Sequence, residues 1–554
     1  MTADLVASAC IDARYAVSWR GMAALEVLLR RALADDDLRS ALGIAPFFAL
    51  LLPLPPDAAS KIASAHARFL LQGASRLRLP PPSPTLSSMR ISFLRGSSNS
   101  NAERVAALLS LDAASFETRL FSSRFEPSAL RELSRLLHPA PLHHVDLGET
   151  DAVEGDGSQP RGLAEHVAAT RIAASRPHVL VDCSGHTAGG FVGALARRPA
   201  HVSVGALGFP GSYGGGLVDY ITADRVVAQP VLQAGAVRGG ATAFAERLAI
   251  LPVTYVVAPW EPPPPPDADR DALLRRPRGV GSSWPVVGSF TRSVRWHPDS
   301  LALWAAVLRV GCAAPRAPAL WLLAEPDVPT QPGVQPGADL QVRSRLAAEW
   351  GALGLRTRSL RFSSWTADKP THLARHAALA LSLDTTPLYG SHTTASDSFF
   401  ASVPLLTLPA ATWASRVGGS VGAAAGAPQA AADSLRAYEG LAEALLCDRR
   451  GPAGAARRAR AGGSRARRPA TGAAHAKRSL GLLLAFRVGA RPSSDLISTL
   501  RATKLPRSSF NRPTAPCSYC CSCGCSCSWS LPTRRPPRTT LRRRTQTVTF
   551  RAIG

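Results

Sequence analysis

Three clusters of cationic, hydroxyl and glycine residues in the second half of the sequence have side chains that could bind an anion. They are Ser289–Arg295, Lys369–Arg375 and Gly390–Asp397, and each of the first and third lies shortly after an apolar run. In the third cluster, a helix is expected to begin near Thr394, so its free backbone N–H groups and its positive dipole end would face a bound anion. The pattern favours a diphosphate site. The alternative is that Thr394 only caps the helix, with Asp397 completing a capping box.

The second cluster is expected to open a helix. Pro370 suits the first helical position, which makes the cations of this cluster project from the first two turns. Cations at this end oppose the helix dipole, and an anion between them would offset that cost. The alternative is a solvated basic face. The candidate nucleotide-binding cations of the first two clusters are Arg292, Arg295, Lys369, His372 and Arg375.

A glycine-rich stretch is the most distinctive feature of the first half of the chain. It contains Gly208, Pro210 and Gly211, followed by three glycines at 214–216. Residues without a Cβ let the backbone approach a ligand closely, so these three residues are candidate ligand contacts. Ordinary loops use the same residue types, and the motif is weak on its own.

The strands and helices that position these clusters are predicted from apolar runs that alternate with helical patterns. From Met89 onward the alternation predicts a parallel sheet wound on both faces, with helices at Pro127–Leu137 and Arg161–Ala174, and a second series begins near residue 286. Within the second series we expect a βαβ unit, with a strand at Leu379–Leu383, a helix from about Ala395 and a strand at Val403–Leu408. The fold class is therefore α/β, with two Rossmann-like lobes around a cleft and ligands at the carboxyl ends of the strands.

Composition divides the chain into five predicted segments. Residues 1–88 form a helical arm and linker, and residues 89–257 form the first lobe. A Pro-rich linker spans 258–285, and the nucleotide-sugar-binding lobe spans 286–450. Residues 451–554 are a basic low-complexity tail that we expect to be disordered.

The net charge of +25 belongs almost entirely to the tail. Residues 449–554 hold 23 lysines and arginines against one acid, Asp495, which leaves +3 for residues 1–448. The charge therefore says little about what the folded part binds, although the tail itself could bind nucleic acid non-specifically. We expect no membrane helix and no signal peptide, since neither a long apolar run nor a basic leader occurs.

The ten cysteines are unevenly distributed. Six crowd residues 517–527, where Cys517 and Cys520 have the spacing of half a zinc site, although the rest is too dense for one. The other four, which are scattered, predict free reduced thiols of a nuclear or cytoplasmic protein: Cys10, Cys183, Cys312 and Cys447.

The order of short motifs along residues 19–450 closely resembles the catalytic region of protein O-GlcNAc transferases and the related SPINDLY-type O-fucosyltransferases. The motifs are Asp182-x-x-Gly185-His186-Thr187, Arg197-Arg198-Pro199-Ala200, Gly208-Phe209-Pro210-Gly211, Asp219-Tyr220-Ile221, Glu246-x-Leu248-x-x-Leu251-Pro252, Gly288-Ser289-Phe290, His297-Pro298, Leu383-Asp384-Thr385, Gly390-Ser391-His392-Thr393-Thr394-x-x-Asp397 and Ala414-Ser415-Arg416-Val417. Together they span both predicted lobes.

The resemblance implies a GT-B fold and inverting transfer of GlcNAc from UDP-GlcNAc to Ser/Thr hydroxyls of proteins, with no metal and no cofactor. It implies that the Lys369–Arg375 cations contact uridine and phosphate, and that Asp397 holds the ribose. The diphosphate cradle would be His392, Thr393 and Thr394. The candidate catalytic residues are His178, His186 and Lys369, where either histidine could instead be structural. The implied partners are a nucleotide sugar and Ser/Thr-containing proteins, without a membrane.

The sequence also departs from the family in ways that leave alternatives open. Where the family places a histidine proposed as catalytic base, this chain has Asn101, which cannot accept a proton as a general base. Arg295 stands where the family usually has a lysine, and no tetratricopeptide array is recognised. GDP-fucose as donor, and a catalytically silent member that binds nucleotide or protein, are therefore the rival hypotheses.

Overall fold

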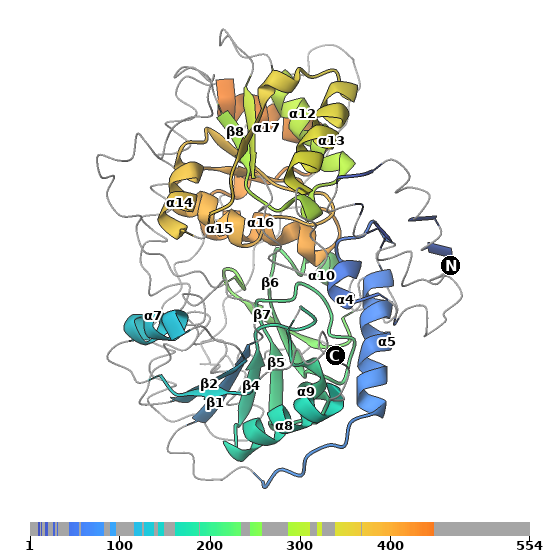
Figure 1. Cartoon of the computed structure of the whole chain (residues 1–554), viewed down its shortest axis with the longest axis vertical. Coiled ribbons are helices and arrows are strands. Elements are labelled where there is room, and N and C mark those ends of the chain that lie inside the picture. Colours follow the sequence, from blue (N-terminus) through green and yellow to red (C-terminus); the bar gives the residue numbers. More distant parts are fainter. Residues whose placement is uncertain are drawn as a thin grey trace, which may run out of the picture. The chain divides into compact units, whose positions relative to one another are not determined.

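The structure is a computed structural model, shown in Figure 1. It describes residues 44–54, 57–81, 89–95, 116–123, 127–137, 142–148, 161–187, 189–233, 244–256, 286–310, 318–323, 338–366 and 368–447, with a few isolated positions before residue 44. Asn101, the Pro-rich linker and the basic tail lie outside the described residues. Expectations for those segments stay predictions.

The first lobe is built on a seven-stranded sheet in which every pair of neighbours is parallel. The spatial order is β3-β2-β1-β4-β5-β6-β7, so the chain reverses direction across the sheet between β1 and β4. The four residues of β4 are all buried, as expected for a central strand covered on both faces. The strands are β1 (Met89–Arg95), β2 (Phe116–Ser122), β3 (His144–Asp146), β4 (Val179–Asp182), β5 (Val202–Gly205), β6 (Tyr220–Asp224) and β7 (Arg247–Leu251).

Helices connect these strands, and Figure 1 shows α8 and α9 lying against the sheet. The helices are α7 (Pro127–Leu137), α8 (Arg161–Ala174), α9 (Val192–Ala196) and α10 (Gln229–Gln233). The bounds of α7 and α8 agree with the sequence prediction. The predicted parallel sheet of the first lobe is confirmed.

The second lobe repeats the same topology with five parallel strands in the order β10-β9-β8-β11-β12. The strands are β8 (Val286–Ser289), β9 (Ala319–Leu323), β10 (Leu360–Ser363), β11 (Leu381–Leu383) and β12 (Leu405–Leu406). The helices are α12 (Pro298–Arg309), α13 (Ala338–Ala352), α14 (Lys369–Ala377), α15 (Thr393–Phe400), α16 (Trp413–Ala424) and α17 (Leu435–Cys447), with three-residue 3₁₀ turns η1 (Ser293–Arg295), η2 (Thr357–Ser359) and η3 (Pro428–Ala430). The predicted βαβ unit is confirmed, because β11 pairs in parallel with β12 and α15 connects them.

Two helices of the arm, α4 (Pro46–Ala49) and α5 (Ala58–Gln72), pack against both lobes. The glycine-rich loop approaches α5 so closely that a Cβ on Gly214, whose φ is +95°, would lie 2.1 Å from the carbonyl oxygen of Ala63. On the other side, the ring of Phe47 in α4 lies 6.3 Å from the ring of Tyr389 in an edge-on contact. At Gly214 the glycine-rich loop therefore packs directly against helix α5 of the same chain.

Helix α16 belongs to the second lobe by sequence and packs into the core of the first. Its Trp413, Val417 and Val421 share one buried hydrophobic cluster with residues from β4, β6 and the α8–α9 region. Two polar contacts accompany this packing. Arg416 Nε donates to the carbonyl of Val226 at 2.7 Å, and Ser420 Oγ donates to Asp224 Oδ2 at 2.6 Å.

The cysteine prediction needs one correction. Cys10 and Cys183 are not in disulfide bonds, as expected, whereas Cys447 at the end of α17 is disulfide-bonded. Its sequence context gives no sign of this, because disulfide formation depends on spatial approach of two Cα atoms and not on spacing along the chain. Among the described helices, none is both long and apolar enough to cross a membrane.

Candidate functional site

The carboxyl edge of the second sheet brings the three anion-compatible clusters to the switch point of the fold. β8 and β11 are neighbours whose connections leave in opposite directions, which is where open α/β sheets bind ligands. The Ser289–Arg295 cluster follows β8, and the turn of the Gly390–Asp397 cluster follows β11. The Lys369–Arg375 cluster lies on α14, which contacts α15 directly.

Asp384, directly after β11, organises the turn before α15. Its Oδ1 accepts hydrogen bonds from the backbone of Thr385 at 2.8 Å and of Ser391, and its Oδ2 accepts from Thr407 Oγ1 at 2.6 Å. The carboxyl is fully buried, and burial raises its pKa despite these donors. A Cβ on Gly418 would lie 2.5 Å from Oδ2, so α16 closes over this carboxyl. Sequence reasoning noted Asp384 as a motif residue and missed this role.

The N-terminus of α15 presents backbone N–H groups without a side-chain cap. His392 occupies the N-cap position but makes no capping hydrogen bond, since its Nε2 contacts the carbonyl of Ala414 at 3.0 Å. Thr394 is the second residue of the helix, so the alternative in which it serves as the N-cap is wrong. The uncapped end favours the anion interpretation, because its N–H groups and dipole are available to a negative charge.

A stack of three side chains links the first and third clusters. The guanidinium of Arg295 lies 4.9 Å from the ring centre of buried Tyr389, and the imidazole of His392 stacks on that ring at 4.6 Å and 20°. Arg295 is the last residue of η1, and Arg292 is the N-cap residue of the same turn. Both arginines are candidates by sequence, whereas the role of the tyrosine that positions Arg295 is seen only in the structure.

Asp397 joins α14 to α15 through two basic groups. Lys369 Nζ lies 2.6 Å from its Oδ1, and His372 Nε2 lies 3.3 Å from its Oδ2. Burial would raise the pKa of Asp397, but the His372 hydrogen bond and the Lys369 charge outweigh it and hold the pKa well below its usual value. The carboxylate therefore stays ionised and is held by these two partners.

Arg375 and the neighbouring His376 are buried, which contradicts the alternative in which α14 presents a solvated basic face. Only 7% of Arg375 is exposed, and burial lowers its pKa. Its Nη1 has no hydrogen-bond partner among the described residues, although it is shielded from solvent. A solvated face would leave this guanidinium in water, so the side of α14 that bears Arg375 is part of the protein interior.

At the carboxyl end of β4 in the first lobe, Asp182 holds a second tight turn. It accepts hydrogen bonds from the backbone of Gly185 at 2.7 Å and from the hydroxyl of Tyr213 at 2.8 Å. Burial raises the pKa of this carboxyl to about 6, while the donors lower it. His186 follows in the same turn, and its Nε2 contacts the carbonyl of Tyr213 at 3.0 Å. Since a carbonyl only accepts, that nitrogen carries the proton.

The two candidate catalytic histidines lie in different places. Burial lowers the pKa of His186 to about 4, so it is neutral at pH 7 at the carboxyl edge of the first sheet. His178 directly precedes β4, and its Nδ1 accepts from the backbone of Arg90 in β1 at 3.0 Å. His178 is therefore at the amino end of the strand, away from the edge where ligands bind. This position contradicts the prediction that His178 is catalytic and favours the alternative, a structural histidine.

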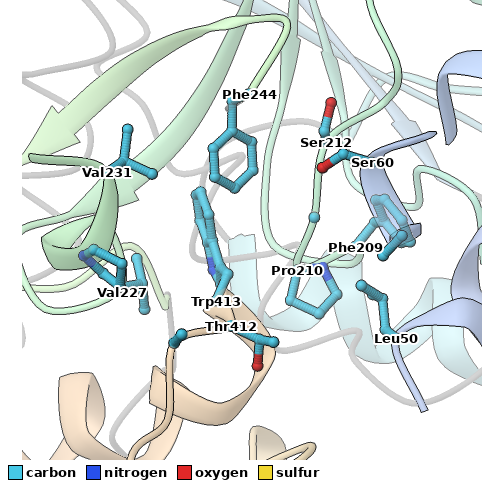
Figure 2. Close-up of a pocket in the computed structure, with 14 residues that line it drawn as sticks. Leu50, Ser60, Phe209, Pro210, Ser212, Val227, Val231, Phe244, Thr412 and Trp413 are labelled. Carbon is cyan, nitrogen blue, oxygen red and sulfur yellow. The ribbon is translucent and has the colours of Figure 1, made fainter. Parts of the chain in front are cut away.

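The glycine-rich motif also needs a correction at Gly208. A Cβ there would lie 2.1 Å from the carbonyl oxygen of Cys183, so the close approach is between two loops of the first lobe and not to a ligand. Pro210 and Gly211 instead line a small pocket between the arm, the first lobe and the start of α16. Figure 2 shows the rings of Trp413 and Phe244 together in this pocket, with Pro210 and Leu50 to one side.

Comparison with known proteins identifies the family. The model of glycosyl transferase family 41 matches residues 160–261 and 285–460. A probable UDP-N-acetylglucosamine–peptide N-acetylglucosaminyltransferase, SEC of Arabidopsis thaliana, is 28% identical over 275 residues, which are 49% of this chain and 25% of that protein. The corresponding SPINDLY protein of Oryza sativa subsp. japonica is 27% identical over 287 residues, which are 52% of this chain and 28% of that protein.

Among solved structures, a mutant O-GlcNAc transferase from Thermobaculum terrenum superposes with a TM-score of 0.64 at 21% identity, covering 88% of this chain and 83% of that one. That similarity supports the GT-B fold. The matches to the two plant proteins span only about a quarter of their length. Since the family model matches residues of both lobes and half of the sequence, the chain belongs to glycosyl transferase family 41.

Proposed function

We propose that the chain transfers GlcNAc from UDP-GlcNAc to Ser/Thr hydroxyls of nuclear and cytoplasmic proteins, with inversion and without a metal ion. One observation carries this proposal. The uncapped N-terminus of α15, the Arg295–Tyr389–His392 stack and the Lys369–Asp397 pair all lie around the switch point of the second sheet. The two plant relatives are named as probable UDP-N-acetylglucosamine–peptide N-acetylglucosaminyltransferases, which supports this choice of donor and of a peptide acceptor.

The chemistry requires stabilisation of negative charge on the departing diphosphate. Backbone N–H groups of Thr393 and Thr394 would donate to it, and Arg295 would supply a fixed positive charge. Tyr389 holds the Arg295 guanidinium in place through the cation–π contact, so little reorganisation is needed during the reaction. Lys369 adds a second cation whose side chain is 39% exposed and can therefore reach a ligand.

The acceptor side of the proposal rests on the first lobe. His186 is the described histidine at the carboxyl edge of the first sheet, and its Nδ1 is the nitrogen that can accept a proton. An imidazole with a pKa near 4 is a weak general base at pH 7, because catalytic bases work best when their pKa lies near the working pH. We assign it the role of orienting the acceptor hydroxyl.

This weakness is a specific reason to keep a second candidate, a member of the family that binds nucleotide without transferring sugar. The buried carboxyl of Asp182, at the same edge of the sheet as His186, already accepts hydrogen bonds from Tyr213 and from the backbone of Ser184 and Gly185. Among the described residues of this turn, neither titratable group therefore combines a free acceptor with a pKa near 7.

A transfer assay decides between these candidates. The full chain is incubated with a Ser/Thr peptide and with labelled UDP-GlcNAc or GDP-fucose in parallel, and UDP and GDP binding are measured by calorimetry. The proposal expects transfer from UDP-GlcNAc. Transfer from GDP-fucose alone would change the donor, and UDP binding without any transfer would favour the silent member. His166→Ala on the exposed surface of α8 is the matched control and should behave as wild type.

A further inference from the structure

Two histidines and one carboxylate on adjacent helices form a cluster with the composition of a metal site. His372 and His376 are four residues apart on α14, which places them on the same face of the helix. Asp397 faces them from α15. The three candidate ligand atoms, one from each side chain, all lie within 4.8 Å of one another.

We propose that His372, His376 and Asp397 bind one divalent transition-metal ion of the Zn²⁺ class. Two imidazoles and a carboxylate are typical ligands of Zn²⁺, whereas Mg²⁺ and Ca²⁺ prefer oxygen ligands. The fourth position is left for water or an anion. The sequence alone predicted no metal, because the spacing of the two histidines does not show that a carboxylate lies against them.

One ligand pair already fits a tetrahedral ion, whereas the 4.8 Å limit on the whole set means that the His376 nitrogen would move closer on binding. Bonds of about 2.0–2.2 Å at tetrahedral angles separate two ligand atoms by roughly 3.3–3.6 Å. The Nε2 atom of His372 lies 3.3 Å from Oδ2 of Asp397, so these two ligands need almost no movement. Lys369 contacts the other oxygen, Oδ1, and can keep this contact while Oδ2 binds the ion.

The burial of His376 and of its Nε2 atom is the observation that distinguishes a metal site from a simple ion pair. This residue is 0% exposed, and its Nε2 is buried with no hydrogen-bond partner among the described residues. A buried acceptor or donor without a partner is costly and rare, and a bound ion would satisfy this one. Burial lowers the pKa of His376 to about 3, so the ring is neutral, as a ligand must be.

The surroundings of His376 also resemble the second shell of a metal site. Its Nδ1 lies 3.1 Å from Ser398 Oγ, which donates its single proton to the carbonyl of Thr394 and lies 2.9 Å from Ser382 Oγ. The imidazole Nδ1–H therefore donates to Ser398, which fixes the tautomer that leaves Nε2 free to bind a metal. The ring of Phe290 packs edge-on against His376 at 4.9 Å and holds it in orientation.

The positive groups near the cluster limit the affinity and have a consequence for nucleotide binding. Lys369 and Arg375 both act electrostatically on His376, so a divalent ion adds to existing positive charge. His372 and Asp397 are also proposed nucleotide contacts, and this step rests on the proposed function. We therefore infer that metal and UDP compete for the same atoms.

Metal content is the direct test, measured on the full chain after chelator treatment and reloading with Zn²⁺ or Co²⁺. The cysteines at 517–527 could also take up metal, so the readout is the difference between wild type and His376→Ala. We expect one Zn²⁺ per chain more in wild type, and a Co²⁺ difference spectrum with tetrahedral d–d bands and no thiolate band. His166→Ala should match wild type.

Equal metal content in wild type and His376→Ala would overturn the site. If His376→Ala fails to fold by circular dichroism, His372→Ala decides the question, because it removes a ligand from a partly exposed position. Competition between Zn²⁺ and UDP is measured in a separate binding experiment. Zn²⁺ at ten times its own Kd should weaken UDP binding about tenfold in wild type and leave His376→Ala unchanged. Metal uptake is measured without nucleotide, so it stays decisive even if UDP does not bind.

Discussion

The ammonium of Lys369 lies 2.6 Å from Oδ1 of Asp397 and joins the first turn of α14 to the middle of α15. The lysine is 39% exposed and the aspartate 10%, so the cation faces solvent while the carboxylate stays inside. A ligand phosphate could reach the ammonium without breaking the pair, because an ammonium has three donors. The pair thus keeps a positive charge at the edge of the site.

Replacing Lys369 by methionine should impair the proposed transfer. The variant keeps the length of the side chain and loses its charge, which we expect to weaken UDP binding at least tenfold. A donor acting on charge that develops in the transition state contributes about 10²–10³ in rate, so kcat/KM should fall by that factor. The measurements are calorimetry with UDP and initial rates with UDP-GlcNAc.

Lys61→Met provides the control for this change. Lys61 is an exposed lysine on α5 that forms an i, i+4 pair with Asp57, and such pairs contribute little to stability. It should keep wild-type UDP affinity. If Lys369→Met also retained wild-type affinity and rate, Lys369 would have no role in donor binding.

His186 should make the stability of the protein depend on pH. Its pKa is about 4 in the folded chain, against an ordinary value of 6.5, so between these pH values the unfolded chain binds a proton that the folded chain does not. Stability therefore falls as pH falls from 6.5 to 4, by up to about 3 kcal/mol, an upper value since part of the ring meets solvent. Urea unfolding at several pH values measures this slope.

The matched variants for this prediction are His186→Gln and His166→Gln. Glutamine at 186 keeps a donor for the carbonyl of Tyr213 but does not titrate, so the loss of stability between pH 6.5 and 4 should become smaller. His166 is exposed on α8, and its replacement should leave the wild-type slope. An unchanged slope in His186→Gln would show that other groups produce it.

The local elements could be predicted from sequence better than the contacts that build the site. Helix α7 begins at Pro127 and α8 matches its predicted bounds, because proline and apolar periodicity mark helices locally. The Asp182–Tyr213 hydrogen bond joins positions 31 residues apart, and nothing in the local pattern shows it. The burial of His376 likewise depends on how α14 packs against α15 and Phe290.

The error at His178 differs, since the sequence already held the information to avoid it. The residue precedes its strand, and in a parallel sheet the ligands lie at the carboxyl ends, so strand direction alone assigns it to the other edge. The error at Gly208 could not be avoided in this way. Its requirement for glycine comes from Cys183, 25 residues earlier, and only the packed loops show it.

Gly208→Ala should therefore destabilise the first lobe without any contribution from ligand binding. The new Cβ would lie 2.1 Å from the backbone oxygen of Cys183, which cannot rotate away as a side chain could. Overpacking of this kind typically costs about 1–3 kcal/mol. Thermal unfolding without nucleotide measures the loss. Gly351→Ala is the matched control, because it has nothing within 4 Å and lies in α13, where alanine should stabilise by up to about 1 kcal/mol.

Ser420→Ala should loosen the packing of α16 against the first lobe. The Ser420 hydroxyl lies 2.6 Å from Asp224 Oδ2 and 2.7 Å from Thr254 Oγ1, and Asp224 is fully buried. A hydrogen bond to a charged group contributes about 1.5–3 kcal/mol, and its loss leaves a buried carboxylate oxygen with one donor fewer. Urea unfolding should show a loss in that range.

The same substitution should leave the donor site intact, because Asp384 and the N-terminus of α15 keep their own hydrogen bonds. UDP affinity is therefore expected to stay within about twofold of wild type, whereas stability falls. A variant with unchanged stability would show that the Ser420–Asp224 bond does not hold α16 in place. Double replacement of Ser420 and Thr254 by alanine then measures their coupling, which for side chains in direct contact is about 0.5–3 kcal/mol. A coupling near zero would mean that each hydroxyl acts on Asp224 and the neighbouring backbone independently.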